Sequence, residues 1–223
     1  MIVLKDICKI YKEGKQIVNA VDHVSFSFEQ GKSYSITGPS GCGKTTLLKI
    51  INLISKPSSG KVVLDGDDDL TKEKCAIHRN EMFGYIAQQY MLIQDLTGYD
   101  NIRIPLLYSK KKQSGKDMKY KIMNAAQKCN ADSFVMHLCK DMSGGEQQRI
   151  AIARAIVNDP KVIVADEPTG ALDSKNGEMI INLLFGLRSD GKTLILATHD
   201  ESIACRCDIQ IKMHDGKIFI DDR

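Results

Sequence analysis

Two hydrophobic periods alternate along the chain, and they predict strands and helices in turn. Residues 33–37 form a short β-type run, and apolar positions at helical spacing over residues 45–54 predict a helix that ends in a turn at residues 57–60. The runs at residues 162–165 and 193–198 are largely apolar, which is typical of strands at the buried centre of a parallel sheet. This order of elements predicts an α/β fold built on a mainly parallel sheet.

The middle of the chain, residues 99–141, has a different character. A polar helical pattern covers about residues 117–130, and a second helix is expected over residues 146–157, before Pro160, because proline cannot continue a helix. We interpret this part as a helical lobe inserted into the α/β core. The expected organisation is a single domain, residues 1–223, with the core at about 1–90 and 158–223 and the helical lobe at about 91–157.

Composition narrows the class of protein. The 223 residues have a formal net charge of +3, with 43% hydrophobic and 26% charged residues, the balance of a soluble globular protein. A charge this small gives no reason to expect a nucleic-acid partner. No apolar run approaches the roughly 18 residues that span a bilayer, and the amino terminus lacks the pattern of a secretory signal. We therefore expect a cytoplasmic chain whose membrane part, if any, belongs to another polypeptide.

The seven cysteines are an odd number at scattered positions, which argues against a disulfide framework and favours a reducing compartment. Cys205 and Cys207 are the only close pair, and a zinc site there would require a second pair or nearby histidines. Small, mostly buried thiols are the simpler interpretation.

The clearest chemical motif is Gly38-Pro39-Ser40-Gly41-Cys42-Gly43-Lys44-Thr45. It fits the phosphate-binding loop pattern and lies between a predicted strand and a predicted helix, as that pattern requires. Glycines let successive backbone N–H groups point at phosphate oxygens, and the following helix presents its positive end to the same anion. Lys44 is expected to reach the β- and γ-phosphates, and the Thr45 hydroxyl can ligate Mg²⁺.

Two adjacent carboxylates end the predicted strand at residues 162–165. Asp166 can hold Mg²⁺ directly or through water, and Glu167 can point at a different spot, where an attacking water would lie. Alone, such a pair would be interpreted as a surface feature at a strand end. Beside a phosphate loop, the chemical interpretation is preferred.

A third motif, Met142-Ser143-Gly144-Gly145-Glu146-Gln147-Gln148, opens the helix predicted before Pro160. Ser143 and Glu146 form a capping box, Ser-x-x-Glu. The two glycines in front of the helix also make a second anion-binding surface, distant in sequence from the first. One chain with two such surfaces suggests that each serves a different copy of the site.

With these motifs in order, the sequence closely resembles the ABC ATPase family. Residues 143–149 resemble its signature motif, with Met142 where leucine is usual, and residues 166–173 resemble its Walker B and D-loop run. The resemblance covers nearly the whole chain. It implies a P-loop NTPase core with a mainly parallel sheet, a small antiparallel β lobe and an inserted helical lobe.

Three single residues also match the family. Gln88 falls where its Q-loop glutamine lies, and the spacing after the preceding Phe-Gly pair favours it over Gln89. His199 matches the switch histidine and Tyr11 the adenine-stacking aromatic. Taken alone, His199 would be interpreted as a core histidine and Tyr11 as a packing residue.

The resemblance implies an ATPase with ATP and Mg²⁺ as its ligands. Two copies would close head to tail on two ATP molecules, on the inner face of the cell membrane, and would drive a separate integral membrane permease. Glu167 would be the general base, with Lys44, Gln88 and His199 as further catalytic residues. Gln88 would also link the site to the lobe that docks on the permease. The implied metal ligands are Thr45, Gln88 and Asp166. The implied nucleotide-binding residues are Tyr11, Gly38, Pro39, Ser40, Gly41, Cys42, Gly43, Lys44, Thr45, Thr46, Ser143, Gly144, Gly145, Glu146 and Asp173, the last crossing the dimer interface.

The motifs also bear on the substrate. Residues 170–173 and Glu146 resemble the subgroup that serves macrolide, lipoprotein and antimicrobial-peptide systems. Export of, or resistance to, an antimicrobial peptide, bacteriocin or similar amphiphile is the preferred function. A non-transport role, signalling through a membrane partner to cell-wall or division machinery, stays open. A soluble ABC protein of translation or repair is disfavoured by the single motif set, and a GTPase by the lack of an Asn-Lys-x-Asp run.

Overall fold

The computed structural model describes residues 1–14, 16–110, 113–189 and 191–220. Its larger sheet has the strand order β5-β6-β7-β3-β8-β9, in which all neighbours are parallel except β8 and β9. A smaller antiparallel sheet has the order β2-β1-β4. The strands are β1 (Ile2–Glu13), β2 (Gln16–Phe28), β3 (Ser33–Thr37), β4 (Ser59–Leu64), β5 (Phe83–Ile86), β6 (Val162–Asp166), β7 (Thr193–Ala197), β8 (Ile209–His214) and β9 (Lys217–Ile220). The expected fold class, with a mainly parallel sheet and a small antiparallel one, is confirmed.

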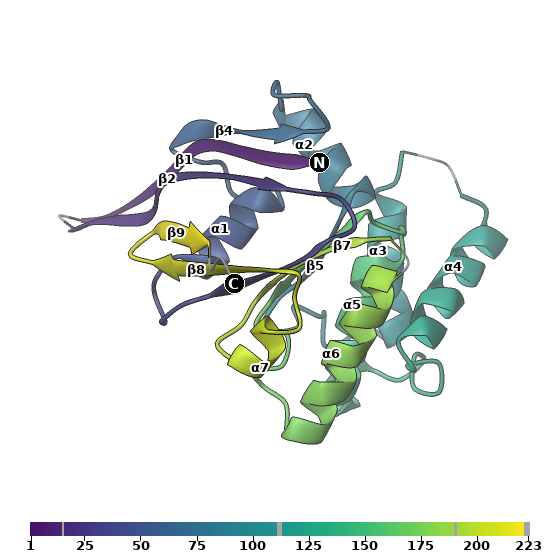
Figure 1. The fold of residues 1–223 in the computed structure, drawn as a ribbon. Coiled ribbons are helices and arrows are strands. Elements are labelled where there is room, and N and C mark those ends of the chain that lie inside the picture. The colour runs from purple at the N-terminus through teal and green to yellow at the C-terminus, as the bar shows by residue number, and fades with distance from the viewer. Residues whose placement is uncertain (15, 111–112, 190, 221–223) are drawn as a thin grey trace.

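The central strands β6 and β7 of the larger sheet are buried on both faces. Successive residues of a strand point to opposite sides of the sheet, so each strand contributes to two cores. Val162 and Val164 of β6 belong to the core under the small sheet, whereas Ile163 and Ala165 belong to the core under the helices. The first core encloses α1 (Lys44–Ile51), which lies between the two sheets (Figure 1). This arrangement explains why the sequence of β6 is apolar at every position before Asp166.

The remaining helices are α2 (Lys72–Glu81), α3 (Gly98–Leu107), α4 (Gly115–Lys128), η1 (Cys139–Asp141), α5 (Gly144–Ile156), α6 (Ser174–Ser189) and α7 (Glu201–Ala204). Of these, α2 packs through Cys75 against the core that holds α1, whereas the core on the opposite face draws its helical residues from α3 onward (Figure 1). Helices α3, α4 and α5 follow β5 in the chain, where the sequence predicts the inserted lobe. Helix α5 shares a core with β6 and β7, so the lobe is continuous with the sheet there, and its boundaries stay a prediction.

Helix boundaries differ from the predicted ones where local hydrogen bonds override the periodicity. Helix α1 ends at Ile51 rather than residue 54, because Leu53 adopts φ +56° and the N–H groups of Ile54 and Ser55 both turn back to the carbonyl of Lys49. Helices α4 and α5 start two residues earlier than predicted. Ser114 and Ser143 are the N-cap residues of capping boxes, so the first helical residue follows each serine immediately. The turn expected at residues 57–60 already enters β4.

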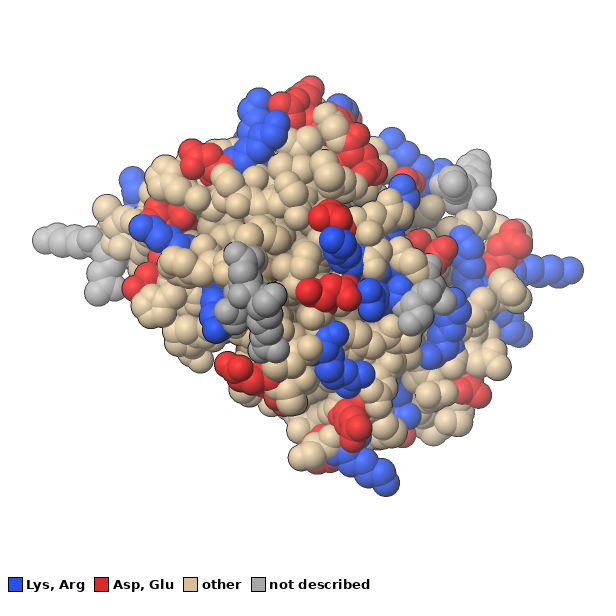
Figure 2. All heavy atoms as spheres, in the orientation of Figure 1, with Lys and Arg blue, Asp and Glu red and all other residues tan. Residues whose placement is uncertain are grey.

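Among the described residues, no helix has both the length and the apolar character needed to cross a membrane. Acidic and basic side chains are interspersed on the face shown in Figure 2.

Candidate active site

The phosphate loop connects β3 to α1, and its glycines are required by the packing around it. A Cβ atom at Gly38 would lie 2.1 Å from the carbonyl oxygen of Met213, and one at Gly43 would lie 2.0 Å from that of Ala20. Both residues also have positive φ. Only glycine fits such positions, so the backbone N–H groups at the start of α1 are fixed at the carboxyl end of β3.

The amino end of α1 is suited to bind an anion. Among the described side chains none caps this helix, and its first turn has no acidic residue. The amino end of a helix carries partial positive charge and free N–H donors. Lys44 adds a full charge: its buried ammonium donates to the carbonyls of Gly38 at 2.7 Å and Pro39 at 3.1 Å. The Cys42 thiol is also buried in this loop.

Asp166 ends β6 beside Thr45. It is buried, its Oδ1 has no hydrogen-bond partner among the described residues, and its Oδ2 accepts a long hydrogen bond of 3.5 Å from the Tyr85 hydroxyl. Burial raises the pKa of Asp166, against the opposing effect of the Thr45 side chain. A buried carboxylate oxygen without a partner, next to a hydroxyl, supplies the oxygen ligands that Mg²⁺ prefers, so these residues fit that ion.

Glu167 follows in a strained conformation. Its φ is +48°, uncommon for a residue with a Cβ, and its N–H donates to the carbonyl of Ala197 at 3.0 Å. Its Oε2 lies 2.7 Å from Nδ1 of His199, whose side chain is 73% exposed. A Cβ atom on Gly170 would lie 3.6 Å from Nε2 of Gln88 and 3.7 Å from Cβ of Glu167. Gln88, Glu167 and His199 therefore gather at the same sheet edge as Asp166.

The signature residues form a second group. Ser143 and Glu146 make the expected capping box, which lowers the pKa of Glu146. A Cβ atom on Gly145 would lie 3.2 Å from Oδ1 of Asn176, and Asn176 in turn bonds Asp173 through its N–H and its amide. These hydrogen bonds lower the pKa of Asp173. No contact described for the signature residues joins them to the phosphate loop.

Tyr11 lies apart from both groups. It pairs with Val18 across the β1–β2 hairpin and is 40% exposed, and the ammonium of Lys9 lies 5.2 Å from its ring centroid. The hairpin does reach the phosphate loop, through the carbonyl of Ala20. Tyr11 therefore presents exposed ring surface on which another ring could stack.

Two side chains of α5 to which the sequence pattern assigned no individual role connect the groups. Gln148, almost fully buried, donates to the carbonyl of Pro168 at 2.7 Å, directly after Glu167. Arg154 donates to the carbonyl of Tyr90 at 2.8 Å and to that of Met91, just beyond Gln88. The available signal was a polar side chain on the buried face of an amphipathic helix, which requires a specific partner.

Comparison with known proteins gives a consistent result. A family model described as "ABC transporter" matches residues 21–170. The uncharacterized ABC transporter ATP-binding protein YvrO of Bacillus subtilis is 39% identical and aligns with all of this chain and 97% of its own length. The macrolide export ATP-binding/permease protein MacB of Hyphomonas neptunium is 39% identical over 99% of this chain, which spans 34% of MacB. A structure of the cassette MJ0796, described as a dimer in a post-hydrolysis state with ADP and Pi, superimposes with a TM-score of 0.93 at 37% identity, covering 100% of this chain and 98% of that one. MJ0796 comes from Methanocaldococcus jannaschii.

Replacing the buried carboxylate should separate stability from activity. Because burial raises the pKa of Asp166 in the folded state, the ionised form costs stability, and the free energy of unfolding falls as pH rises from the ordinary value of 3.8 through the folded value. Asp166→Asn should therefore gain stability over the wild type as pH rises above the ordinary carboxyl pKa, while ATPase activity falls by about 10–100-fold. Urea unfolding at several pH values measures the first effect, with exposed Asp132→Asn as the control. A variant less stable than the wild type at pH 7 would contradict this account.

Proposed function

Because this chain belongs to the ABC transporter family and is an ATP-binding ATPase subunit, we propose that two copies close head to tail on two ATP molecules and drive a separate membrane permease. The observation that carries the proposal is the separation of two anion-facing groups on one chain. Thr45 of the phosphate loop meets Asp166, and Glu167 and His199 lie at the same sheet edge, whereas Gly145 lies beside Asn176.

Each group by itself leaves one side of a nucleotide open. The start of α1 supplies N–H donors and Lys44 on one side of the phosphates, and the start of α5 supplies a second helix amino terminus. In a head-to-tail pair, Ser143 and Gly145 of one protomer would meet the γ-phosphate held by the other. Asp173, exposed beside the signature residues, would lie at the interface. The relative MJ0796, solved as a dimer, supports this arrangement.

Hydrolysis would use the carboxylate of Glu167, whose direction is set by its left-handed backbone. Glu167 would accept a proton from the attacking water, and its hydrogen bond to Nδ1 of His199 would hold it in place and leave Nε2 to contact the γ-phosphate. Thr45, Asp166 and Gln88 would hold Mg²⁺, whose charge stabilises the phosphates as negative charge develops. Lys44 would move its donors from the loop carbonyls to the β- and γ-phosphates.

Removing the base should trap the ATP-bound dimer. Glu167→Gln keeps the shape of the side chain and should retain ATP binding, while hydrolysis falls by about 10²–10⁴-fold. Light scattering with saturating ATP should then show a dimer that disperses when ATP is removed. Glu178→Gln, at an exposed position of α6, should hydrolyse ATP at the wild-type rate. A Glu167→Gln protein that stays monomeric with ATP bound would exclude the closed-pair arrangement.

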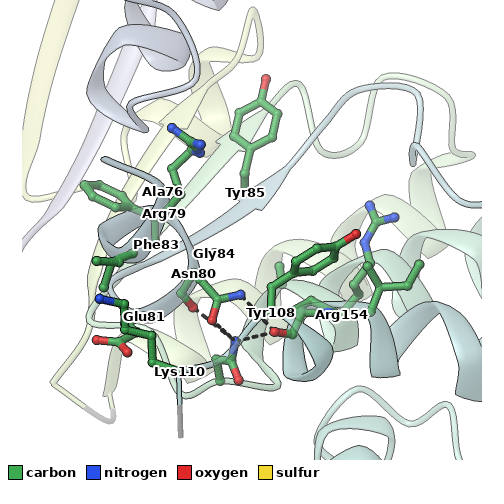
Figure 3. A pocket seen from close by; sticks show the side chains of 15 residues that line it. Ala76, Arg79, Asn80, Glu81, Phe83, Gly84, Tyr85, Tyr108, Lys110 and Arg154 are labelled. Carbon is green, nitrogen blue, oxygen red and sulfur yellow. Dashed lines mark hydrogen bonds between the residues drawn. The ribbon is translucent and has the colours of Figure 1, made fainter. Parts of the chain in front are cut away.

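We assign the docking of the permease to a groove between α2, β5, α3 and α5. The groove has a volume of about 490 Å³, and hydrogen bonds from Asn158 to Asn80 and from Asn80 to the carbonyl of Pro105 join its walls (Figure 3). Tyr108, which lines the groove directly after α3, is 76% exposed and offers aromatic surface to a partner. A cytoplasmic segment of the permease is the proposed occupant, which would place the chain on the inner face of the cell membrane.

Arg154 gives this groove a physical connection to the nucleotide. Its side chain lines the groove and bonds the carbonyls of Tyr90 and Met91, which follow Gln88 in the chain. Both of these residues have positive φ, at 45° and 51°. A permease segment that displaced Arg154 would therefore shift the loop that carries Gln88. Conversely, a shift of that loop on ATP binding would move Arg154 and change the shape of the groove.

If the permease binds in this groove, a charge introduced at Tyr108 should weaken that binding. In a Glu167→Gln background, Tyr108→Glu should reduce recovery of a co-purifying multi-span protein from detergent-solubilised native membranes by roughly fivefold or more, since loss of a buried aromatic anchor costs at least about 1 kcal/mol. Tyr120→Glu is the matched control, because Tyr120 is 71% exposed on α4, outside the groove. Equal recovery of the permease with both variants would place docking elsewhere. Recovery of only ribosomal or DNA-bound proteins would instead favour a soluble role.

For the substrate we propose an antimicrobial peptide, bacteriocin or similar amphiphile. The support is the resemblance of residues 170–173 and Glu146 to that subgroup, and the similarity to proteins described as macrolide exporters. The second candidate is a non-transport role in signalling to cell-wall or division machinery, which the same ATPase chemistry would serve.

A cellular test separates the two roles. Host cells carrying Lys44→Ala should become at least several-fold more sensitive to amphipathic peptides and should accumulate a labelled peptide, whereas exposed Lys56→Ala should behave as wild type. Unchanged peptide accumulation together with altered cell-wall hydrolase activity would favour signalling and overturn the export proposal.

A further inference from the structure

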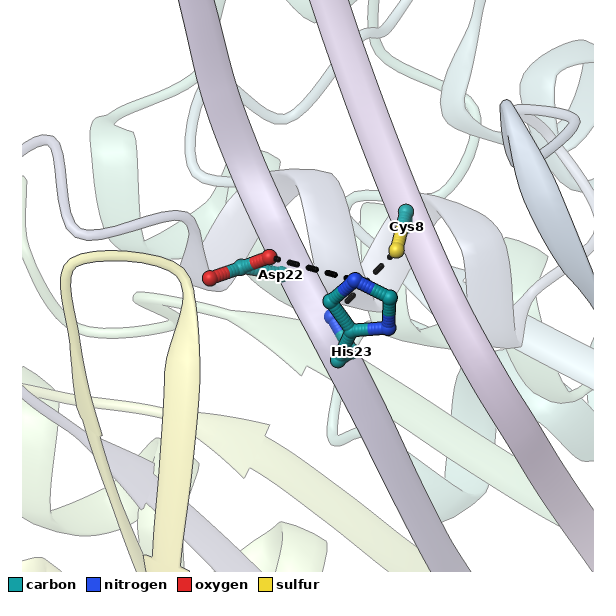
Figure 4. A group of neighbouring side chains, drawn as sticks. All are labelled: Cys8, Asp22 and His23. Carbon is teal, nitrogen blue, oxygen red and sulfur yellow. Dashed lines mark hydrogen bonds and ion pairs between the residues drawn. The ribbon is translucent and has the colours of Figure 1, made fainter.

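We propose that Cys8, Asp22 and His23 form a zinc-binding site on the β1–β2 sheet, separate from the nucleotide. One ligand atom from each of these three residues lies within 4.8 Å of the other two (Figure 4). Cys8 is on β1, and Asp22 and His23 are on the neighbouring strand β2. In Figure 4 the imidazole ring lies between the Asp22 carboxylate and the Cys8 thiol.

One separation is already close to that in a zinc coordination sphere, and the other two are within 4.8 Å. Nε2 of His23 lies 3.9 Å from Oδ1 of Asp22. Bonds of about 2.0–2.3 Å from a tetrahedral Zn²⁺ place neighbouring ligand atoms roughly 3.4–3.8 Å apart. Small side-chain rotations would therefore bring the three donors onto one ion, with a fourth position left for water, as in three-ligand zinc sites.

Asp6 already holds the imidazole in the orientation that a metal ligand needs. Its Oδ1 lies 2.7 Å from Nδ1 of His23. Metal-binding histidines usually give their second ring N–H to a carboxylate, which fixes the tautomer and makes the other nitrogen a stronger ligand. The backbone N–H of His23 donates to the sulfur of Cys8 at 3.3 Å, and such a bond would stabilise the thiolate once metal binds.

The backbone around the cluster is irregular in a way that directs these side chains together. Asp6 and His23 both have positive φ, at 52° and 50°. The β1–β2 pairing shifts register between Leu4 and Ile7 and again between Ile7 and Lys9. Bulges and left-handed residues of this kind re-aim side chains and cost stability, so they persist where neighbouring contacts compensate for that cost.

The donor set favours zinc over harder ions. A thiolate, an imidazole and a carboxylate are its usual ligands, whereas Mg²⁺ and Ca²⁺ prefer oxygen alone. Cys8 is 8% exposed, but the side chains of His23 and Asp22 are 68% and 30% exposed, so an ion can enter from solvent. Lys217 lies 3.4 Å from the other oxygen of Asp22 and leaves Oδ1 toward the imidazole. Binding would release the thiol proton of Cys8 to solvent.

The test uses the full chain, stripped of metal and without nucleotide. Titration with Zn²⁺ against a coloured chelator should show one equivalent bound per chain, and Co²⁺ should give a thiolate-to-cobalt charge-transfer band. His23→Gln and Cys8→Ser should each weaken zinc binding by more than about 100-fold and abolish the band, and Asp6→Asn should weaken binding by about 10–100-fold. Because His23 is exposed, His23→Gln keeps the test valid even if the buried Cys8 variant folds poorly.

Two control variants distinguish this site from other donors. His214 pairs with the exposed Asp215 at 3.2 Å, a similar ion pair, and Cys205 is an exposed cysteine near Cys207. His214→Gln and Cys205→Ser should bind zinc as the wild type does. Zinc binding that survives His23→Gln, or that is lost with Cys205→Ser, would overturn the proposal, as would a Co²⁺ complex without a thiolate band.

Discussion

The site depends on how closely two backbone carbonyls approach the phosphate loop. The carbonyl of Met213, from β8, packs against Gly38, and that of Ala20, from β2, packs against Gly43. The loop is therefore held between the large sheet and the small one, and a side chain at either glycine would force them apart. From this position α1 points its amino end at the sheet edge where Asp166, Glu167 and His199 emerge. The chemistry of the site is arranged by a packing constraint on atoms that take no part in it.

The same sheet edge concentrates features that cost stability. Asp166 keeps a buried oxygen without a partner among the described residues, and Glu167 has a left-handed backbone. Each such feature costs about 1–3 kcal/mol. A protein retains such costs where a ligand offsets them, and a divalent ion bound to a nucleotide would supply the charge that Asp166 requires. Stability and activity would therefore be opposed at this residue.

Helix α5 is hydrogen-bonded both to the segment after Glu167 and to the loop after Gln88. Its amino end carries Ser143, its buried face bonds Pro168 through Gln148, and its far end bonds the loop after Gln88 through Arg154. A movement of α5 would therefore shift the segment after Glu167, the loop after Gln88 and the groove proposed for the permease. In the proposed ATP-driven closure, this helix would transmit the movement as a rigid body.

Local sequence was sufficient for the strands β3, β6 and β7 and for the phosphate loop, because their apolar runs and glycines carry the information themselves. It was insufficient for α2, none of whose residues is buried, so it has no hydrophobic stripe to detect. Contacts between distant segments, such as Gly145 with Asn176 and Arg154 with Tyr90, cannot be seen in a local pattern. The cluster around His23 was missed because a β-bulge has no consistent signature in residue type.

The central claim is that each ATP site needs a second copy of the chain, and mixing two inactive variants tests it directly. Both variants carry Glu167→Gln; one adds Lys44→Ala, and the other adds Ser143→Asp, which still caps α5 but places negative charge where phosphate would bind. Either variant alone has two broken sites, whereas a mixed pair has one intact site. The account predicts ATP-dependent association, seen by light scattering, only in the mixture. Dimerisation of either variant alone, or none in the mixture while the Glu167→Gln parent dimerises, would contradict the composite site.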